Sequence, residues 1–136
     1  MLVEWLALAK RKLLSGPYSL VVVKDRKPVF VGNRKGLIDL INVIDTFFPL
    51  VDAAVADRVV GRAAALLLLY ARASAVYAHV LTKPALRLLH GTSTYLEFGT
   101  LAEALARYCP FEQAVQNITD PEEAYRRLRA LAYRTA

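Results

Sequence analysis

The sequence predicts an α/β domain that combines an antiparallel hairpin with parallel strands. Two patterns carry this prediction. First, β-branched runs flank the charged residues 24–27, which is typical of an antiparallel hairpin. Second, strand and helix patterns alternate from Val51 onward. A βαβαβ alternation implies parallel strands. At 136 residues the chain has the length of one domain, which we assign to residues 1–136.

The first part of the chain is expected to form a helix, the hairpin and a second helix. Apolar residues recur at helical spacing over residues 2–14, and glycine and proline follow at 16 and 17. The hairpin strands are expected at residues 19–23 and 29–32, with the inner strand buried on both faces. Apolar residues from Leu37 to Phe48 predict a second helix, which Pro49 ends.

The rest of the chain is expected to supply the parallel strands and further helices. The predicted strands are residues 51–56, 75–81 and 92–98, and the predicted connecting helices are residues 58–71 and 84–91. Helical turns follow at 100–107, and another helix opens at Cys109 and Pro110. The last helix begins where Asp120 caps, Pro121 takes the first position and Glu123 completes a capping box.

The net charge of +6 is concentrated near the N-terminus. Residues 1–35 hold eight of the eighteen basic residues against Glu4 and Asp25, whereas the remainder balances at ten against ten. Trp5 and Tyr18 accompany this basic region, but it lacks a recognition-helix signature and interleaved aromatic residues. The pattern favours a solvated basic surface over a nucleic-acid interface.

The sequence gives no sign of export or membrane insertion. Cys109 is the single cysteine, so no intramolecular disulfide is available, which fits a reducing compartment. The charges at residues 10–12 follow the apolar N-terminal stretch, the reverse of a signal peptide. The apolar run 63–71 is far shorter than the ~20 residues that span a bilayer. We therefore expect a cytoplasmic protein.

The expected helix start after the strand 51–56 is the candidate ligand site. Open α/β sheets bind ligands where strands end and helices present unpaired N–H groups. Asp57 is predicted to cap this helix or to orient a ligand. Arg58 and Arg62, four residues apart, would share one helical face and repel each other, so either a protein carboxylate or a bound anion should compensate. Gly61 would permit close backbone approach or tight helix packing.

Three further residues complete the candidate set. Lys83 begins the next helix and is expected at the same sheet edge. Cys109, at the cap of a helix, is either a nucleophile or a small buried residue; no histidine lies near it in the sequence. Glu112, at the third position of that helix, is placed to stabilise the helix N-terminus or to compensate the two arginines. The candidate ligand is small and anionic.

Four segments carry a resemblance to a known family: residues 56–67, 75–78, 109–115 and 120–124, which read ADRVVGRAAALL, AVYA, CPFEQAV and DPEEA. They resemble the small prokaryotic family known as domain of unknown function 1893, whose fold is similar to that of cytidine deaminases. The resemblance implies a three-layer α-β-α sandwich around a mixed five-stranded sheet, with the hairpin at one end and the parallel strands at the other, and it implies no known activity. The chain departs from the family pattern at residues 102–108, where a polar Arg- and Gly-containing loop is expected.

The deaminase comparison argues against a catalytic zinc. Zinc deaminases place a His or Cys with a Glu at one helix start and Pro-Cys-x-x-Cys at the next. Here the corresponding residues 62–64 and 84–88 hold no metal ligands. We expect no metal and no cofactor. The leading hypothesis is a protein that binds a small anionic or nucleotide-like ligand at the sheet edge, as an enzyme or a binding module. The alternative is a structural or interaction module with a basic N-terminal face. A homodimer remains open.

Overall fold

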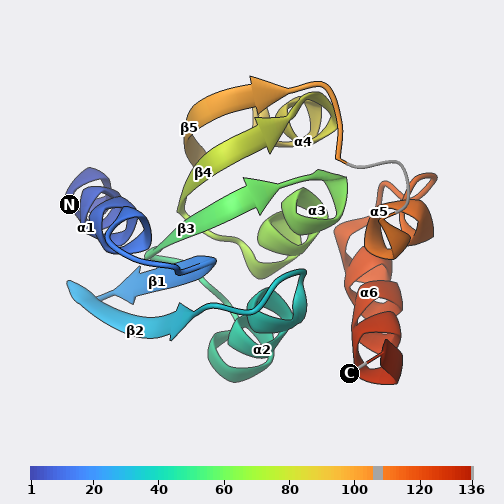
Figure 1. The fold of residues 1–136 in the computed structure, drawn as a ribbon, viewed down its shortest axis with the longest axis horizontal. Helices are drawn as coiled ribbons and strands as arrows, with labels where there is room; N and C mark the ends of the chain where they lie inside the picture. Colours follow the sequence, from blue (N-terminus) through green and yellow to red (C-terminus); the bar gives the residue numbers. More distant parts are fainter. Residues whose placement is uncertain (106–108, 136) are drawn as a thin grey trace.

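The computed structural model describes residues 1–105 and 109–135, which form a mixed five-stranded sheet with helices on both faces (Figure 1). The strand order is β2-β1-β3-β4-β5. β1 pairs antiparallel with both β2 and β3, and β3, β4 and β5 are parallel. The predicted α/β fold, with its hairpin and parallel strands, is confirmed. The strands are β1 (Leu20–Lys24), β2 (Lys27–Gly32), β3 (Ala53–Val60), β4 (Ala75–Thr82) and β5 (Tyr95–Ala102).

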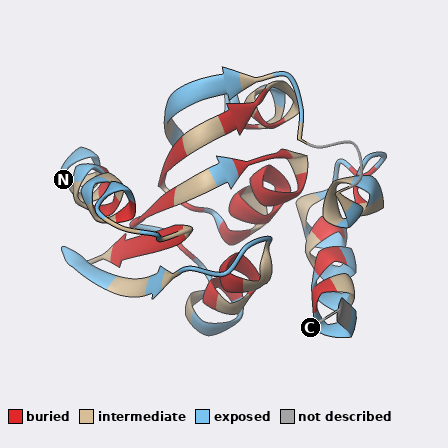
Figure 2. Ribbon diagram, viewed as in Figure 1, coloured by how far each residue is buried: buried red, intermediate tan, exposed pale blue. Residues whose placement is uncertain are grey.

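The helices divide unequally between the two faces. α1 packs its buried leucines on β1, β3 and β4 from one side. On the other side the larger core includes residues of α2, α3, α4 and α6, with α5 beside α6 (Figure 1). Buried residues concentrate in the central strands and α3 (Figure 2). The helices are α1 (Leu2–Leu14), α2 (Ile38–Phe47), α3 (Arg62–Ala71), α4 (Lys83–Leu89), α5 (Pro110–Ala114) and α6 (Pro121–Thr135).

The N-terminal elements agree closely with the sequence. α1 has the predicted bounds, and residues 20–23 of β1 are buried, as expected for a strand with a core on each face. The hairpin turn is tighter than predicted because Asp25 and Arg26 alone form it, with φ of 52° and 67°. Two central residues with positive φ are typical of a two-residue hairpin turn, so the ladder extends to the Lys24–Lys27 pair.

β3 is longer than the predicted strand, and α3 begins four residues later than expected. The parallel ladder with β4 continues to the Val60–Leu81 pair, which keeps this part of the backbone extended. Asp57 and Arg58 are consequently strand residues, and the cap position of α3 is Gly61. The predictions that residues 51–56 form the whole strand and that a helix begins at Arg58 are therefore wrong.

The segment after α4 also differs from the prediction. Residues 92–94 form a turn, in which the Thr92 N–H donates to the Leu89 carbonyl at 3.3 Å, and β5 begins only at Tyr95. The ladder with β4 then runs to the Thr82–Ala102 pair. The predicted helical turns at 100–107 are therefore wrong as far as residue 105, because residues 100–102 are strand and residues 103–105 are not helical. Residues 106–108 lie outside the described residues.

α6 is held on the body of the protein by buried and polar contacts. Its start is capped as predicted, since Asp120 Oδ2 accepts from the Glu123 N–H at 3.1 Å. At the α2 side, Asp45 accepts hydrogen bonds from Tyr125, from Tyr133 at 2.8 Å and from Arg129 at 3.1 Å. No helix in the described ranges is long and apolar enough to cross a membrane.

Replacing Asp45 with Asn should destabilise the protein by about 1–2 kcal/mol at neutral pH, because hydrogen bonds to a charged acceptor are lost. Burial raises the pKa of Asp45, but the bonds from Tyr125, Tyr133 and Arg129 outweigh burial, and the net pKa lies below 3.8. This stabilisation is therefore complete above pH ~4 and disappears as the pH falls through the lowered pKa. Urea unfolding across pH measures it, with exposed Asp52→Asn as control. An equal effect of both variants would contradict the role of Asp45.

Candidate functional site

A cavity of about 630 Å³ opens where β3 ends and α3 begins. Its walls come from the residue just before β1, the loop between β2 and α2, the end of β3, the first turn of α3, the segment leading into α5 and α5 itself. Most of its surface is apolar. The carboxyl end of a parallel strand next to a helix start is a common ligand position in α/β proteins. The lining residues are Ser19, Arg34, Lys35, Gly36, Leu37, Asp57, Arg58, Val59, Gly61, Ala63, Ala64, Leu105, Cys109, Phe111 and Glu112.

Asp57 is the acidic group of β3 in this cavity. It is paired with Leu20 and Ala78, both of which belong to the core on the α2 and α3 side. Burial raises the pKa of Asp57 to about 7, although the backbone N–H groups of Val59 and Arg58 stabilise the carboxylate. Within residues 1–105 and 109–135 it has no salt-bridge partner. The cavity therefore contains a carboxyl group that can hold or release a proton near neutral pH.

Arg58 follows Asp57 along β3, so its side chain leaves the opposite face of the sheet. Its Nε donates to the Tyr18 carbonyl at 3.1 Å, and one NH₂ group donates to the carbonyls of Leu13 at 2.9 Å and Gly16 at 3.1 Å. These carbonyls lie at and just beyond the end of α1, where a cation satisfies unpaired acceptors. Arg58 is thus a structural residue of the α1 face. The expectation that it shares a helical face with Arg62 is wrong.

The N-terminus of α3 is already occupied by a carboxylate of the protein. Glu112 Oε1 accepts from the Arg62 N–H at 2.8 Å, and Oε2 accepts from the Ala63 N–H at 2.6 Å. Glu112, rather than Asp57, therefore fills the capping role, and the prediction that Asp57 caps this helix is wrong. A Cβ at Gly61 would collide with the carboxylate of Glu112 and with the Leu105 side chain. The glycine is therefore needed for a close approach to the cap.

The guanidinium of Arg62 is also engaged by the backbone. Its Nε donates to the Val115 carbonyl at 3.0 Å, and an NH₂ group donates to the Ile118 carbonyl. These carbonyls follow α5, so Arg62 and Glu112 together fasten the segment 112–118 to α3. The sequence left open whether a protein carboxylate or a bound anion compensates the positive charge at this helix start. The structure places a protein carboxylate there, that of Glu112.

The two remaining candidates lie in different surroundings. Lys83 does not line the cavity; its Nζ lies 2.5 Å from Glu103 Oε1, with both side chains substantially exposed. Cys109 is half-buried, lines the cavity and occupies the cap position of α5 without a side-chain capping bond. His79 contacts Tyr77 on the α1 side of the sheet, with Nδ1 3.0 Å from the tyrosine hydroxyl. It is therefore not placed to activate the thiol.

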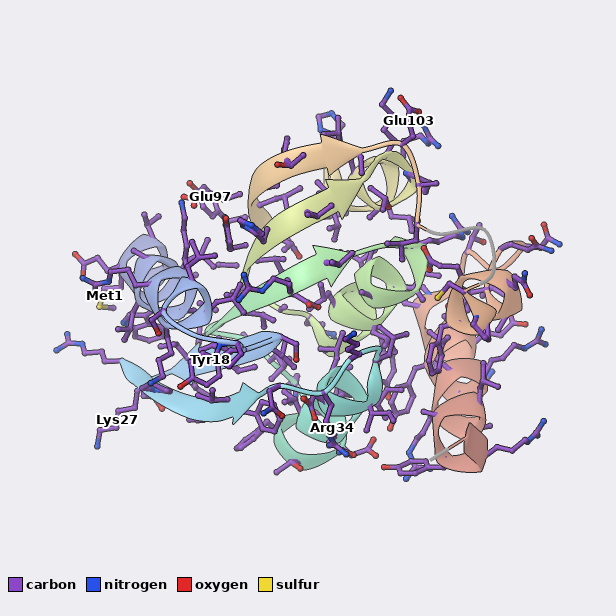
Figure 3. All side chains as sticks on the ribbon, in the orientation of Figure 1. Met1, Tyr18, Lys27, Arg34, Glu97 and Glu103 are labelled. Atoms are coloured by element: carbon purple, nitrogen blue, oxygen red, sulfur yellow. The ribbon has the colours of Figure 1, made fainter. Side chains whose placement is uncertain are left out.

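Sequence reasoning missed the wall that the loop before α2 contributes. Arg34, which is labelled in Figure 3, forms an ion pair with Asp39 at 2.6 Å beside the start of α2, and exposed Lys35 follows it in the sequence. Neither residue stands in a recognisable motif, and only the fold brings this loop to the end of β3. The described residues contain no group of three or more His, Cys, Asp or Glu side chains that could hold a metal ion.

Asp57→Asn should stabilise the protein increasingly as the pH rises from ~4 to ~7. Because burial raises the pKa of Asp57 from 3.8 to about 7, the folded state binds more protons than the unfolded state in this window. Wild-type stability then falls relative to the variant by up to about 1.4 kcal/mol per pH unit. Thermal unfolding from pH 4 to 8 measures the difference, with Asp52→Asn as control. A difference that does not change with pH would rule out the raised pKa.

Glu112→Ala should cost about 1–2 kcal/mol, because two N–H groups of α3 lose their acceptor at the positive end of the helix. Sulfate or phosphate should then stabilise the variant more than the wild type, since the vacated helix start accepts an anion. Melting temperatures with and without added sulfate measure both effects. Glu122→Ala, which removes an exposed carboxylate of α6, is the control. An equal sulfate response in wild type and variant would contradict the assignment of Glu112.

The comparisons with known proteins agree on one family. The model of the domain of unknown function DUF1893 (TM1506) matches residues 8–131. Among solved structures, a DUF1893 family protein from Thermotoga maritima, TM1506, is similar with a TM-score of 0.84 and 28% sequence identity. The match covers 93% of this chain and 89% of that one. No curated protein matches. The chain, which shares the fold of TM1506 over nearly its whole length, belongs to the DUF1893 family.

Proposed function

We propose that this protein binds a small nucleotide-like ligand in the cavity at the end of β3. The planar, N–H-bearing part of the ligand would lie inside against Asp57, and its anionic part would lie at the rim near Lys35. One observation carries the proposal: a desolvated carboxyl without a salt-bridge partner in the described ranges lines a cavity of about 630 Å³ with mostly apolar walls.

The energetics of Asp57 support a ligand that donates hydrogen bonds. A buried carboxylate costs free energy unless donors compensate for lost water. The two backbone N–H groups leave acceptor capacity on the carboxylate oxygens. A ring edge with adjacent N–H groups would add charge-assisted bonds and lower the pKa of Asp57. Phe111 and Leu37 offer apolar contact for a planar ring.

The charge at the rim supports an anionic group at the outer end of the ligand. Lys35 is exposed and borders the cavity, and no ion pair engages it within residues 1–105 and 109–135. Arg34 stands beside it, held by Asp39. We therefore assign the anionic part of the ligand to this loop and not to Arg58 and Arg62, where the sequence led us to expect it. Both arginines donate to backbone carbonyls instead.

We propose binding without catalysis, so Cys109 lines the wall of the cavity and has no chemical role.

A similarity to the cytidine deaminase fold remains part of the proposal; the antiparallel hairpin beside parallel strands supports it. The absence of zinc remains a prediction, because the positions that hold ligands in zinc deaminases are occupied by Arg62, Ala85 and Leu88 at the starts of α3 and α4. One zinc per chain in elemental analysis of unchelated protein would overturn that expectation.

A second candidate function is an interaction module with a basic N-terminal face. The observation that favours it is the internal use of the charged set: Arg58, Arg62 and Glu112 all bind groups of the protein itself. In this case the cavity would be incidental, and ligands of the class proposed above would not bind.

A panel of nucleobases, nucleosides and nucleoside monophosphates separates these functions by thermal shift and calorimetry. A ligand at a hundredfold excess over its Kd should stabilise the wild type by about 2.7 kcal/mol. Asp57→Asn should abolish binding although it raises basal stability, and Lys35→Ala should weaken only the phosphorylated ligands. Lys27→Ala, on the distant hairpin, is the matched control. If no panel member shifts the wild type, or if Asp57→Asn shifts equally, the binding proposal fails.

A further inference from the structure

We infer that the ring edge received by Asp57 carries two adjacent N–H donors, the 2-amino-4-oxopyrimidine edge that guanine and pterins share, and that its binding releases a proton. The inference rests on the proposed function, because it specifies the ligand of the same cavity. Three features support it: the hydrogen-bonding state of the lining side chains, the donors that a carboxylate requires, and the burial of Asp57.

Most polar side chains of the cavity already have partners within the protein. The Ser19 hydroxyl donates to the Arg34 carbonyl at 2.8 Å, and the Arg34 guanidinium is paired with Asp39 at 2.6 Å. Arg58 donates to the carbonyls at the end of α1, and Glu112 accepts from the first N–H groups of α3. Within residues 1–105 and 109–135, the polar lining side chains that remain available to a ligand are those of Asp57, Lys35 and Cys109.

Of these three side chains, Asp57 is the one suited to read the ring of a ligand. The exposed ammonium of Lys35 lies at the rim, and a thiol such as that of Cys109 is only a weak donor and acceptor. Asp57 belongs to the central strand β3, and part of its surface is accessible through the cavity. The donor pattern that its carboxyl group accepts therefore decides which ring fits.

A carboxylate only accepts hydrogen bonds, so it pairs with a ring edge that presents two donors side by side. Guanine and pterins present a ring N–H next to an amino group. Adenine and cytosine place a ring-nitrogen acceptor beside the amino group, and uracil places a carbonyl on each side of its N–H. In those rings a lone pair would face a carboxylate oxygen. Two parallel charge-assisted bonds thus favour the guanine-type edge over the others.

Binding of this edge is coupled to the ionisation of Asp57. Because burial raises the pKa of Asp57 to about 7, the free protein holds a proton on this carboxyl about half of the time at pH 7. Two N–H donors require the ionised form, so the proton passes to solvent when the ligand binds. A neutral carboxyl would instead present an O–H beside an acceptor oxygen, which suits adenine, and binding would then take up a proton.

The groups around Asp57 leave this linkage to Asp57 itself. Asp39 opposes the ionisation of Asp57 through its charge, and Arg58 leaves the opposite face of the sheet. Histidine is the side chain whose ordinary titration falls between pH 5 and 8, and none borders the cavity within the described residues. The charged or titratable groups that line or adjoin the cavity from the loop before α2 and from α2, α3 and α5 are Arg34, Lys35, Asp39, Arg62, Cys109 and Glu112.

Calorimetric titrations of the full chain with guanosine, pterin, inosine, adenosine and cytidine at neutral pH test the ring edge. Guanosine or pterin should bind about 10- to 100-fold more tightly than inosine, which lacks the amino group and so loses one hydrogen bond to a charged acceptor. Tighter binding of guanosine than of pterin identifies a nucleoside ligand, and the reverse identifies a pterin. Asp57→Asn should lose this binding, whereas the exposed control Asp52→Asn should retain it.

The tighter-binding of guanosine and pterin, titrated from pH 5 to 8, tests the proton. Since only the ionised carboxyl accepts both donors, the apparent Kd should be roughly 100-fold higher at pH 5 than at pH 8. Titrations in buffers of different ionisation enthalpy should show a proton released on binding. Inosine, adenosine or cytidine binding as tightly as the better of guanosine and pterin, or tighter binding at pH 5, would refute the inference and leave the proposed function standing. If none of these compounds and no nucleotide binds, the proposed function fails with it.

Discussion

The parallel ladder between β3 and β4 determines where the charged groups around the cavity lie. By continuing to Val60, it keeps residues 57–60 extended. Successive side chains of a strand point to opposite faces, so Asp57 and Arg58 are separated by the sheet. The acid lines the cavity on the α3 side, and the arginine binds the end of α1. A helix beginning at Arg58 would have placed both groups on one terminal turn.

The position of the C-terminal segment depends on the point where β3 ends and α3 begins. Because β3 ends at Val60, the first free N–H groups of α3 belong to Arg62 and Ala63, and Glu112 accepts from both. Arg62 in turn donates to the carbonyls that follow α5. The wall of the cavity that contains Phe111 and Cys109 is thereby fastened to the sheet. The helix start, a common anion site in α/β proteins, is used to build the cavity instead.

Local patterns in the sequence were sufficient for the hairpin, the parallel strands, most element types and the bounds of α1, and the arrangement of the sheet followed from the family resemblance. They failed at strand ends, because the lengths of β3 and β5 depend on the ladder with β4, which no local pattern encodes. The same limitation applies to the site. The residues around position 57 were predicted to lie at a ligand site, and a cavity lies there, but the contribution of Lys35 to its lining depends on a loop that only the tertiary fold brings there. Arg58 and Arg62 donate to backbone carbonyls. Because every residue has a carbonyl, the sequence does not indicate which ones accept these hydrogen bonds.

The central claim is that the carboxyl of Asp57 is desolvated inside the cavity in which we propose that a ligand binds. Carbon-detected NMR titration of the aspartate side chains tests it most directly, with Asp57→Asn to assign the signal. The account predicts that Asp57 titrates near pH 7, well above the ordinary value of 3.8, and that a bound ligand moves its pKa downward. A signal that titrates near pH 4 in the free protein would contradict the account.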